Sequence, residues 1–266
     1  MIKGTRSIPP SGAAIVTHLE VFRQCLVTSA EIAKIIGNKQ GSNAHEQVIR
    51  SLISHGWLRG LSVRGVYEFM PANSGPLPSG NPLIEAMAVL RRSPTLKIQM
   101  VLWGAAFFGS FADRAPRRYT VIVPEQAPIQ NGLAQVYEVI RAAPTRFFGA
   151  FLRDGVPVSG AERLLFDAAL WPDRAGDLRD SDHWLRASLV KSDTATIVAF
   201  ARQLDSYRVT ARAGYFAESF GRPDVAAALA ELRPQGMLHI GHPSDPYIAR
   251  DARFGVIDHI GIARAR

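Results

Sequence analysis

Three polar residues recur at helical spacing in the segment SNAHEQVIRSLIS: Asn43, Gln47 and Arg50. Asn43 and Gln47 lie one helical turn apart, and each carries an amide that can both donate to and accept from the edge of an adenine. Arg50 can direct its forked guanidinium to a guanine or to a phosphate. These residue types in this order predict a helix that contacts bases in the major groove of duplex DNA.

Two predicted helices would position this polar face. In the first, Ser29 is expected to be the N-cap, because its hydroxyl can accept a hydrogen bond from a free first-turn N–H. Isoleucines at positions 32, 35 and 36 follow at helical spacing until Gly37 ends the helix. The second helix begins at about Ser42. It has an apolar face that we expect to be buried and a polar face that we expect to be exposed: Val48, Ile49, Leu52 and Ile53 against Asn43, His45, Glu46, Gln47 and Arg50.

After Gly56 the apolar pattern changes from helical to alternating. Residues 57–69 therefore predict two short strands, joined at a tip that Arg64 and Gly65 form. Two helices followed by such a hairpin make a winged helix-turn-helix, which we expect over residues 1–75.

Positive charge is concentrated in the same part of the chain. The 266 residues carry a net charge of +8, and residues 1–75 contribute +4 of it, with eight Lys and Arg residues against four Glu residues. This excess favours a polyanionic partner. The alternative is that the two helices pack against another protein and that the charges are only solvated. We expect Asn43, Gln47 and Arg50 to contact bases. Phosphates or the minor groove should be contacted by Lys39, Arg59 and Arg64. Other residues expected to contact the DNA are Lys3, Arg6, Gln40, Ser42 and His45.

A cluster of Pro, Gly and Ser, PANSGPLPSGNP at residues 71–82, supports neither a helix nor the interior of a sheet. We place a domain boundary there and expect a larger α+β domain over residues 83–266, so the fold class is α+β. Ser159 and Glu162 have the spacing of a capping box at the start of one of its helices. The other expected helices span 83–92, 97–109, 161–171, 194–204, 209–220 and 223–232, and the expected strands lie within 119–125, 135–142, 147–158 (a hairpin turning at Asp154 and Gly155), 237–241 and 253–262.

The sequence holds no complete catalytic motif. Residues 104–109 have the glycine spacing of a phosphate-binding loop, but Ser110 stands where the loop requires a lysine. His239–His242 spells the signature of class I aminoacyl-tRNA synthetases, but Pro243 follows where a helix should begin. Helix capping explains the densest acidic cluster better than a metal site does: Asp173, Asp177, Asp180, Asp182 and His183. We therefore expect no enzymatic activity, no metal and no cofactor.

Other features restrict the setting. The single cysteine, Cys25, excludes an internal disulfide and a Cys-based zinc cluster. The longest apolar stretch, residues 98–112, is about fifteen residues long and a membrane span needs about twenty, so we expect a buried helix there. The N-terminal residues MIKGTRSIPPSG lack an apolar export segment, and we expect a cytoplasmic protein. A basic loop with Arg114, Arg117 and Arg118 could contact nucleic acid or an acidic protein, and a solvated loop is the equal alternative.

Four segments in a fixed order carry a family resemblance: the hairpin region GWLRGLSVRGVYEFMP, then VLWGAAFFG, VSGAERLLFDAALWP and VTARAGYFAESFG. With them the chain resembles the AbiEi-type antitoxins of type IV toxin–antitoxin systems, which are phage abortive-infection modules. The resemblance implies an N-terminal DNA-binding domain that represses its own operon. It also implies a C-terminal domain that counters a nucleotidyltransferase-like toxin encoded beside it, and it brings no catalytic motif.

We therefore expect a DNA-binding antitoxin that occupies an inverted repeat as two copies, paired mainly by the DNA and monomeric or weakly dimeric in solution. Neutralisation of the toxin would belong to residues from about Leu83 onward and need not involve direct contact. One alternative is a stand-alone winged-helix regulator whose second domain senses a ligand or oligomerises. The other is a nucleic-acid-modifying enzyme, supported only by the acidic cluster and by the three arginines of the basic loop.

Overall fold

The computed structural model describes residues 6–37, 39–127, 131–180, 182–232 and 236–262, and the chain divides into two compact units. The first unit contains residues 1–96 and 128–136, and the second contains residues 97–127 and 137–266. Both units mix helices and strands, so the expected α+β fold class is confirmed.

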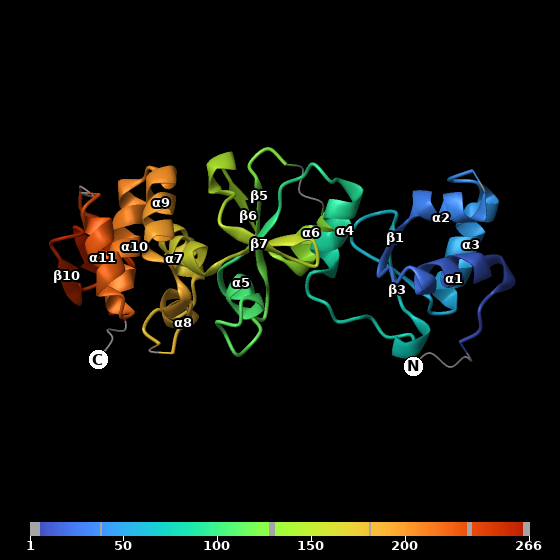
Figure 1. The fold of residues 1–266 in the computed structure, drawn as a ribbon, viewed down its shortest axis with the longest axis horizontal. Helices are drawn as coiled ribbons and strands as arrows, with labels where there is room; N and C mark the ends of the chain where they lie inside the picture. The colour runs from blue at the N-terminus through green and yellow to red at the C-terminus, as the bar shows by residue number, and fades with distance from the viewer. Residues whose placement is uncertain (1–5, 38, 128–130, 181, 233–235, 263–266) are drawn as a thin grey trace. The chain divides into compact units, whose positions relative to one another are not determined.

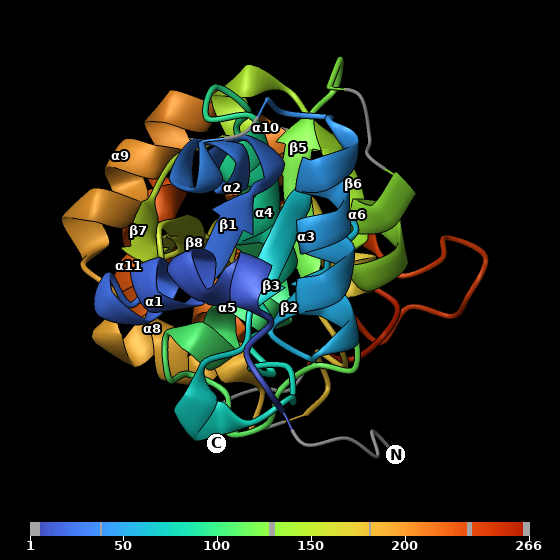
Figure 2. The same cartoon turned by 90° about the vertical axis from the view of Figure 1, so that its right-hand side faces the viewer.

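The first unit begins with a winged helix-turn-helix, as expected. Its strands form a three-stranded antiparallel sheet in the order β1-β3-β2, with the helices packed around it (Figure 2). Its elements are α1 (Ala13–Val21), β1 (Leu26–Thr28), α2 (Ser29–Ile36), α3 (Asn43–Ser54), β2 (Leu58–Gly60) and β3 (Val66–Phe69). The sequence predicted the two strands of the wing, but β1 is too short to show an alternating pattern.

A capping box starts α2, one residue earlier than expected. The Thr28 hydroxyl accepts a hydrogen bond from the N–H of Glu31 at 3.2 Å, and the Glu31 carboxylate accepts one from the N–H of Thr28 at 2.8 Å. Ser29 is therefore the first residue of the helix, and its expected role as N-cap is wrong. Gly37 ends the helix in the left-handed conformation, with φ of +67°, as expected.

The core of the winged helix is apolar and closely packed. Ile32 from α2 and Leu52 from α3 are fully buried, and Trp57 stacks on Phe69. Ile53, which we expected on the buried face of α3, is 40% exposed.

Two further helices belong to the first unit: α4 (Ile84–Arg92) and α6 (Asn131–Val136). The expected boundary at residues 71–82 does not coincide with the division between the units, because α4 lies beyond it and packs with β1 and β3. Residues 71–82 include a short 3-10 helix, Ala72–Ser74, and Ser79 donates its N–H to buried Glu68 at 2.9 Å. The Pro- and Gly-rich segment is thus held by hydrogen bonds to the winged helix.

The second unit is built on a five-stranded mixed sheet in the order β6-β5-β4-β8-β7. Its strands are β4 (Gln99–Val101), β5 (Thr120–Pro124), β6 (Glu138–Ala142), β7 (Ala150–Arg153) and β8 (Val156–Ser159). The expected hairpin is confirmed, with Asp154 and Gly155 at φ of +50° and +77° in the tight turn between β7 and β8.

The expected helix over residues 97–109 is wrong in its first part. Residues 99–101 form β4, a central strand, and only from Leu102 does the chain continue as α5 (Leu102–Phe108). A short buried strand and a buried helix are both apolar throughout, so periodicity does not distinguish them. The expectation of one buried helix over residues 98–112 is corrected in the same way.

Helices dominate the rest of the second unit, and α9, α10 and α11 pack side by side (Figure 1). The helices are α7 (Ala161–Leu170), α8 (Trp184–Lys191), α9 (Thr194–Leu204), α10 (Tyr207–Ser219) and α11 (Pro223–Ala230), and a small sheet follows in the order β10-β11-β9 from β9 (Leu238–Ile240), β10 (Ala249–Asp251) and β11 (Val256–Asp258). The expected capping box of α7 is wrong, because the N-cap is Gly160 and the Ser159 hydroxyl accepts from the Gln99 amide instead. None of the described helices combines the length and apolar character that a bilayer crossing requires.

Candidate nucleic-acid interface

The polar face of α3 is exposed where the sequence predicts it. The side chains of Asn43, Gln47 and Arg50 all lie at the surface. Arg50 is 71% exposed and pairs with Glu46 on the next turn, with 3.5 Å between Nη2 and Oε2. An exposed pair of this kind contributes little to stability, so the guanidinium can exchange Glu46 for another anion at small cost.

His45 corrects the predicted interface. It is only 1% exposed, although we expected it to face the solvent. Its Nδ1 accepts from the N–H of Gly41 at 3.2 Å, and its Nε2 donates to the carbonyl of Ser29 at 2.9 Å. These bonds hold the start of α3 against the start of α2, so His45 has a structural role in this helix pair.

The turn before α3 contains both a residue that caps the helix and polar residues that are exposed to solvent. Ser42 is the N-cap of α3, and its hydroxyl accepts from the N–H of His45 at 3.3 Å. Lys39 and Gln40 are exposed in the same turn. Lys3 lies outside the described residues.

Arg64 projects from the tip of the wing. It is exposed, and Gly65 beside it has a φ of +79°, which glycine adopts without strain. The N–H of Ser29 donates to the carbonyl of Gly65 at 2.8 Å, which ties the wing tip to the start of α2. A groove of about 470 Å³ separates α3 from the wing and is lined by both Arg50 and Arg64.

Two of the predicted cations are engaged within the fold. Arg59 on β2 pairs with Glu68 on β3, at 2.7 Å between Nε and Oε2, and Glu68 is fully buried. Arg6 donates to the carbonyls of Met70 and Pro71, and its guanidinium lies 3.9 Å from the centre of the Trp57 ring. The structure thus places both arginines in internal contacts that the sequence did not indicate.

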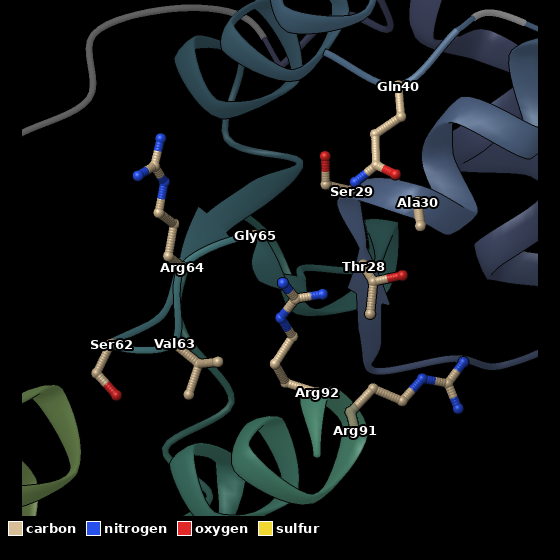
Figure 3. A pocket seen from close by; sticks show the side chains of 10 residues that line it. All are labelled: Thr28, Ser29, Ala30, Gln40, Ser62, Val63, Arg64, Gly65, Arg91 and Arg92. Atoms are coloured by element: carbon tan, nitrogen blue, oxygen red, sulfur yellow. The ribbon is translucent and has the colours of Figure 1, made fainter. Parts of the chain in front are cut away.

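A second groove, of about 590 Å³, contains two basic residues that the sequence analysis missed. Its walls are the start of α2, the wing loop and the C-terminal end of α4, from which Arg91 and Arg92 extend (Figure 3). The indication in the sequence was two consecutive arginines at the end of an amphipathic helix. Because this helix follows the Pro- and Gly-rich segment, the sequence predicts it in the other domain and gives no reason to place these two arginines beside the wing.

The basic loop of the second unit is mostly solvent-exposed. Arg114 and Arg117 are at the surface, whereas Arg118 donates to the carbonyl of Tyr137 at 2.9 Å. The carbonyl of Arg114 accepts from the Trp103 indole at 2.9 Å, which fixes the loop. Contact of these arginines with a partner stays a prediction.

The acidic cluster forms turns and a helix cap. Hydrogen bonds from the side chain and the N–H of Arg179 lower the pKa of Asp177 to about 2. His183 is the N-cap of α8, since its Nδ1 accepts from the N–H of Leu185, and burial lowers its pKa. The described residues contain no group of three or more His, Cys, Asp or Glu side chains placed to hold a metal ion.

Comparisons with known proteins agree with this architecture. A solved structure, that of the RV2827C protein from Mycobacterium tuberculosis, matches with a TM-score of 0.77 at 22% identity and covers 97% of this chain and 94% of that one. At this identity the likeness shows a shared fold. No curated protein matches the chain. The family model of the AbiEi antitoxin C-terminal domain matches residues 99–219. Residues 99–219 are thus similar to the AbiEi antitoxin C-terminal domain, and the expected resemblance to this family is confirmed.

Proposed function

We propose that the protein is a DNA-binding antitoxin. Its winged helix represses the operon that encodes it, and its second unit counters a nucleotidyltransferase-like toxin encoded beside it. The observation that carries the DNA-binding half is the exposed stripe of Asn43, Gln47 and Arg50 beside the wing with Arg64 at its tip. The antitoxin half rests on the AbiEi domain of the second unit. A protein that represses its operon works where that DNA lies, in the cytoplasm.

The stripe has the chemistry for base contacts and the wing has the chemistry for backbone contacts. An α-helix fits the major groove, where the amides of Asn43 and Gln47 can each make two hydrogen bonds to an adenine. Arg50 reaches a guanine or a phosphate by exchanging its exposed partner Glu46 for it. Arg64 contacts phosphates or the minor groove, and such contacts fix the position of the protein on the DNA without distinguishing sequences.

Two copies would bind an inverted repeat. One winged helix contacts only a few base pairs, and discrimination against a whole genome needs more contacts than that. We expect the copies to be monomeric or weakly dimeric in solution and paired by the DNA. Native mass spectrometry of the saturated complex checks this, and one copy on the full site would contradict it.

The DNA-binding half is tested with the full-length chain on two duplexes of equal length, the DNA upstream of its own gene and a scrambled version. Asn43→Ala should reduce the difference in binding free energy between them by about 1–3 kcal/mol if the contact is bidentate. Arg64→Ala should weaken binding to both equally and reduce the salt dependence. Arg23→Gln is the matched control, because Arg23 is exposed in the same unit but lines neither groove. Equal loss on both duplexes for Asn43→Ala would show that Asn43 contacts no base.

The antitoxin half is tested by co-expression with the product of the adjacent gene. We compare growth with the wild-type chain and with the Asn43→Ala/Gln47→Ala/Arg50→Ala variant, which keeps both units but lacks the stripe. Rescue by both supports neutralisation that does not need DNA binding, as expected if the second unit counters the toxin. Rescue by the wild type alone would make repression part of neutralisation, and rescue by neither would favour a stand-alone regulator.

A further inference from the structure

The groove between α2, the wing loop and α4 is strongly basic. Three of its lining residues are arginines, Arg64, Arg91 and Arg92, and none is Asp or Glu (Figure 3). Figure 3 shows Arg64 extending from the wing and Arg91 and Arg92 extending in different directions from the end of α4, with Arg92 directed between the wing and α2. The lining therefore suits an anionic ligand.

Hydrogen bonds hold the three walls together. The wing loop is joined to α2 by the bond from Ser29 to Gly65, and to α4 by Ser62, whose N–H donates to the Glu85 carboxylate at 3.0 Å. An ion pair between Glu31 and Arg91 joins α2 to α4. Because each wall is tied to the next, a ligand would meet a preformed groove, and the loss of conformational entropy on binding would be confined to the arginine side chains.

The charges of the groove are only partly compensated. Glu31 balances Arg91, but Arg64 and Arg92 form no ion pair among the residues that the structure describes. An alternative explanation for Arg91 and Arg92 is that they stabilise α4, because cations in the last turn of a helix compensate its dipole. That effect is confined to the helix end and does not explain why Arg64 lines the same groove.

The groove continues into the one between α3 and the wing. Four residues line both of them: Ser29, Gln40, Arg64 and Gly65. A DNA strand that follows α3 and passes the wing tip therefore reaches the end of α4 along two adjoining grooves that share Arg64. Free phosphate shares the chemistry of this ligand, but the continuity with the α3 face favours the DNA backbone.

We propose that Arg64, Arg91 and Arg92 form a clamp for backbone phosphates, which extends the DNA interface beyond the winged helix to α4. This inference rests on the proposed DNA binding. The clamp contacts phosphates only, so it adds affinity for every sequence and does not select the operator.

The test measures binding of the full-length chain to a scrambled duplex of three helical turns, over a series of salt concentrations. Each phosphate contact lowers the slope of log K against log salt by about 0.9, so Arg92→Ala should make the slope shallower by that amount and weaken binding about fivefold to tenfold near 0.1 M salt. The same fold-change is expected on the DNA upstream of the gene. Arg23→Gln is the matched loss of one exposed charge and should have a smaller effect.

A second variant is expected to strengthen binding, which misfolding would not do. Glu31→Gln removes the charge that balances Arg91 while keeping an acceptor for the capping box. It should tighten binding to both duplexes severalfold, and adding Arg91→Ala should abolish that gain. Thermal unfolding of each variant shows whether the helix dipole alone accounts for any loss.

The outcomes separate this inference from the proposed function. Wild-type protein that binds DNA, with Arg92→Ala and Glu31→Gln unchanged in affinity and slope, would overturn the clamp and leave DNA binding by α3 intact. A wild type that binds neither duplex would overturn both. Calorimetric titration with inorganic phosphate is the third arm, and Arg92-dependent phosphate binding with Arg92-independent DNA affinity would mean a small-anion site and overturn the clamp.

Discussion

Arginines with opposite roles can be compared between the two units. In the first unit, Arg64 and Arg92 extend from the protein into an open groove. In the second unit, Arg163 on α7 is fully buried, donates from Nε to Asp167 at 2.7 Å and lies over the ring of Phe148. In these examples, the guanidiniums without an internal carboxylate partner are the ones that stay available to a ligand. Residue type and net charge alone do not reveal this difference.

The largest effect should come from leaving the buried arginine unpaired. Asp167→Ala removes the acceptor of Arg163, whose two terminal nitrogens have no hydrogen-bond partner among the described residues, and also the acceptor of the Leu102 N–H. We expect the second unit to lose about 3–5 kcal/mol in free energy of unfolding, measured by hydrogen exchange of α7 in a urea series.

The matched control for this variant removes both charges. Arg163→Met/Asp167→Leu should cost clearly less than the single substitution, because no unpaired ion stays buried. A loss of less than about 1 kcal/mol in unfolding free energy for Asp167→Ala would show that Arg163 does not depend on Asp167 for its burial.

The two arginines of the wing test the same rule within one hairpin. Arg59→Ala leaves buried Glu68 without its cation and should destabilise the first unit by about 1.5–3 kcal/mol. Arg64→Ala should change stability by less than about 0.5 kcal/mol, since Arg64 is exposed at the tip. Urea unfolding and DNA titration of both variants provide the measurements. Similar stability losses for the two would remove the distinction between engaged and available arginines.

His45 and Asn43 extend the comparison to uncharged polar residues on α3. His45→Ala should cost about 1–3 kcal/mol, because it removes a buried ring together with its hydrogen bonds to the N–H of Gly41 and the carbonyl of Ser29. After its DNA affinities are corrected for the unfolded fraction, the variant should prefer the DNA upstream of the gene over the scrambled duplex as strongly as the wild type does. A selective loss of the preferred DNA would return His45 to the set of base-contacting residues.

The smallest effect concerns pH and the ion pair beside the groove. Partial burial of Glu31 raises its pKa, but the hydrogen bonds from Thr28 and the charge of Arg91 outweigh it and lower the pKa overall. A lowered folded-state pKa contributes stability that is fully present above the unfolded value of about 4.3 and is lost as pH falls through the folded value. The difference in unfolding free energy between the wild type and Glu31→Gln should therefore be constant from pH 7 to about 5 and disappear in more acidic solution. A difference that persists at the lowest pH would mean that the charge of Glu31 does not contribute.

Helices with one apolar face were predictable from the sequence, and short buried strands were not. Residues 43–54 alternate polar and apolar positions at helical spacing, so α3 and its exposed stripe follow from the pattern. β4 lies inside a continuous apolar run, where a strand and a helix have the same composition.

The sequence predicts which polar residues the candidate site contains, but it does not predict which of them are buried or paired with other residues of the fold. His45 has the polarity of its neighbours, and only the approach of α2 to α3 shows that its ring is buried. Arg59 needs Glu68 opposite it on β3, a pairing that depends on strand register. Arg92 joins the site through packing that crosses the Pro- and Gly-rich segment.

The bond between Ser62 and Glu85 also bears on how the first unit could be reused in another protein. A gene fusion cut at the Pro- and Gly-rich segment would separate the wing loop from the helix that anchors it and would expose Ile84, Ala88 and Val89, all of which are buried. A transplantable cassette therefore needs at least α4, so a different effector should be joined after Leu96 and not at residues 71–82, and α6 belongs to the same unit. Recombination in this gene should tolerate exchange of the effector portion more readily at that junction than at the segment whose composition suggests a linker.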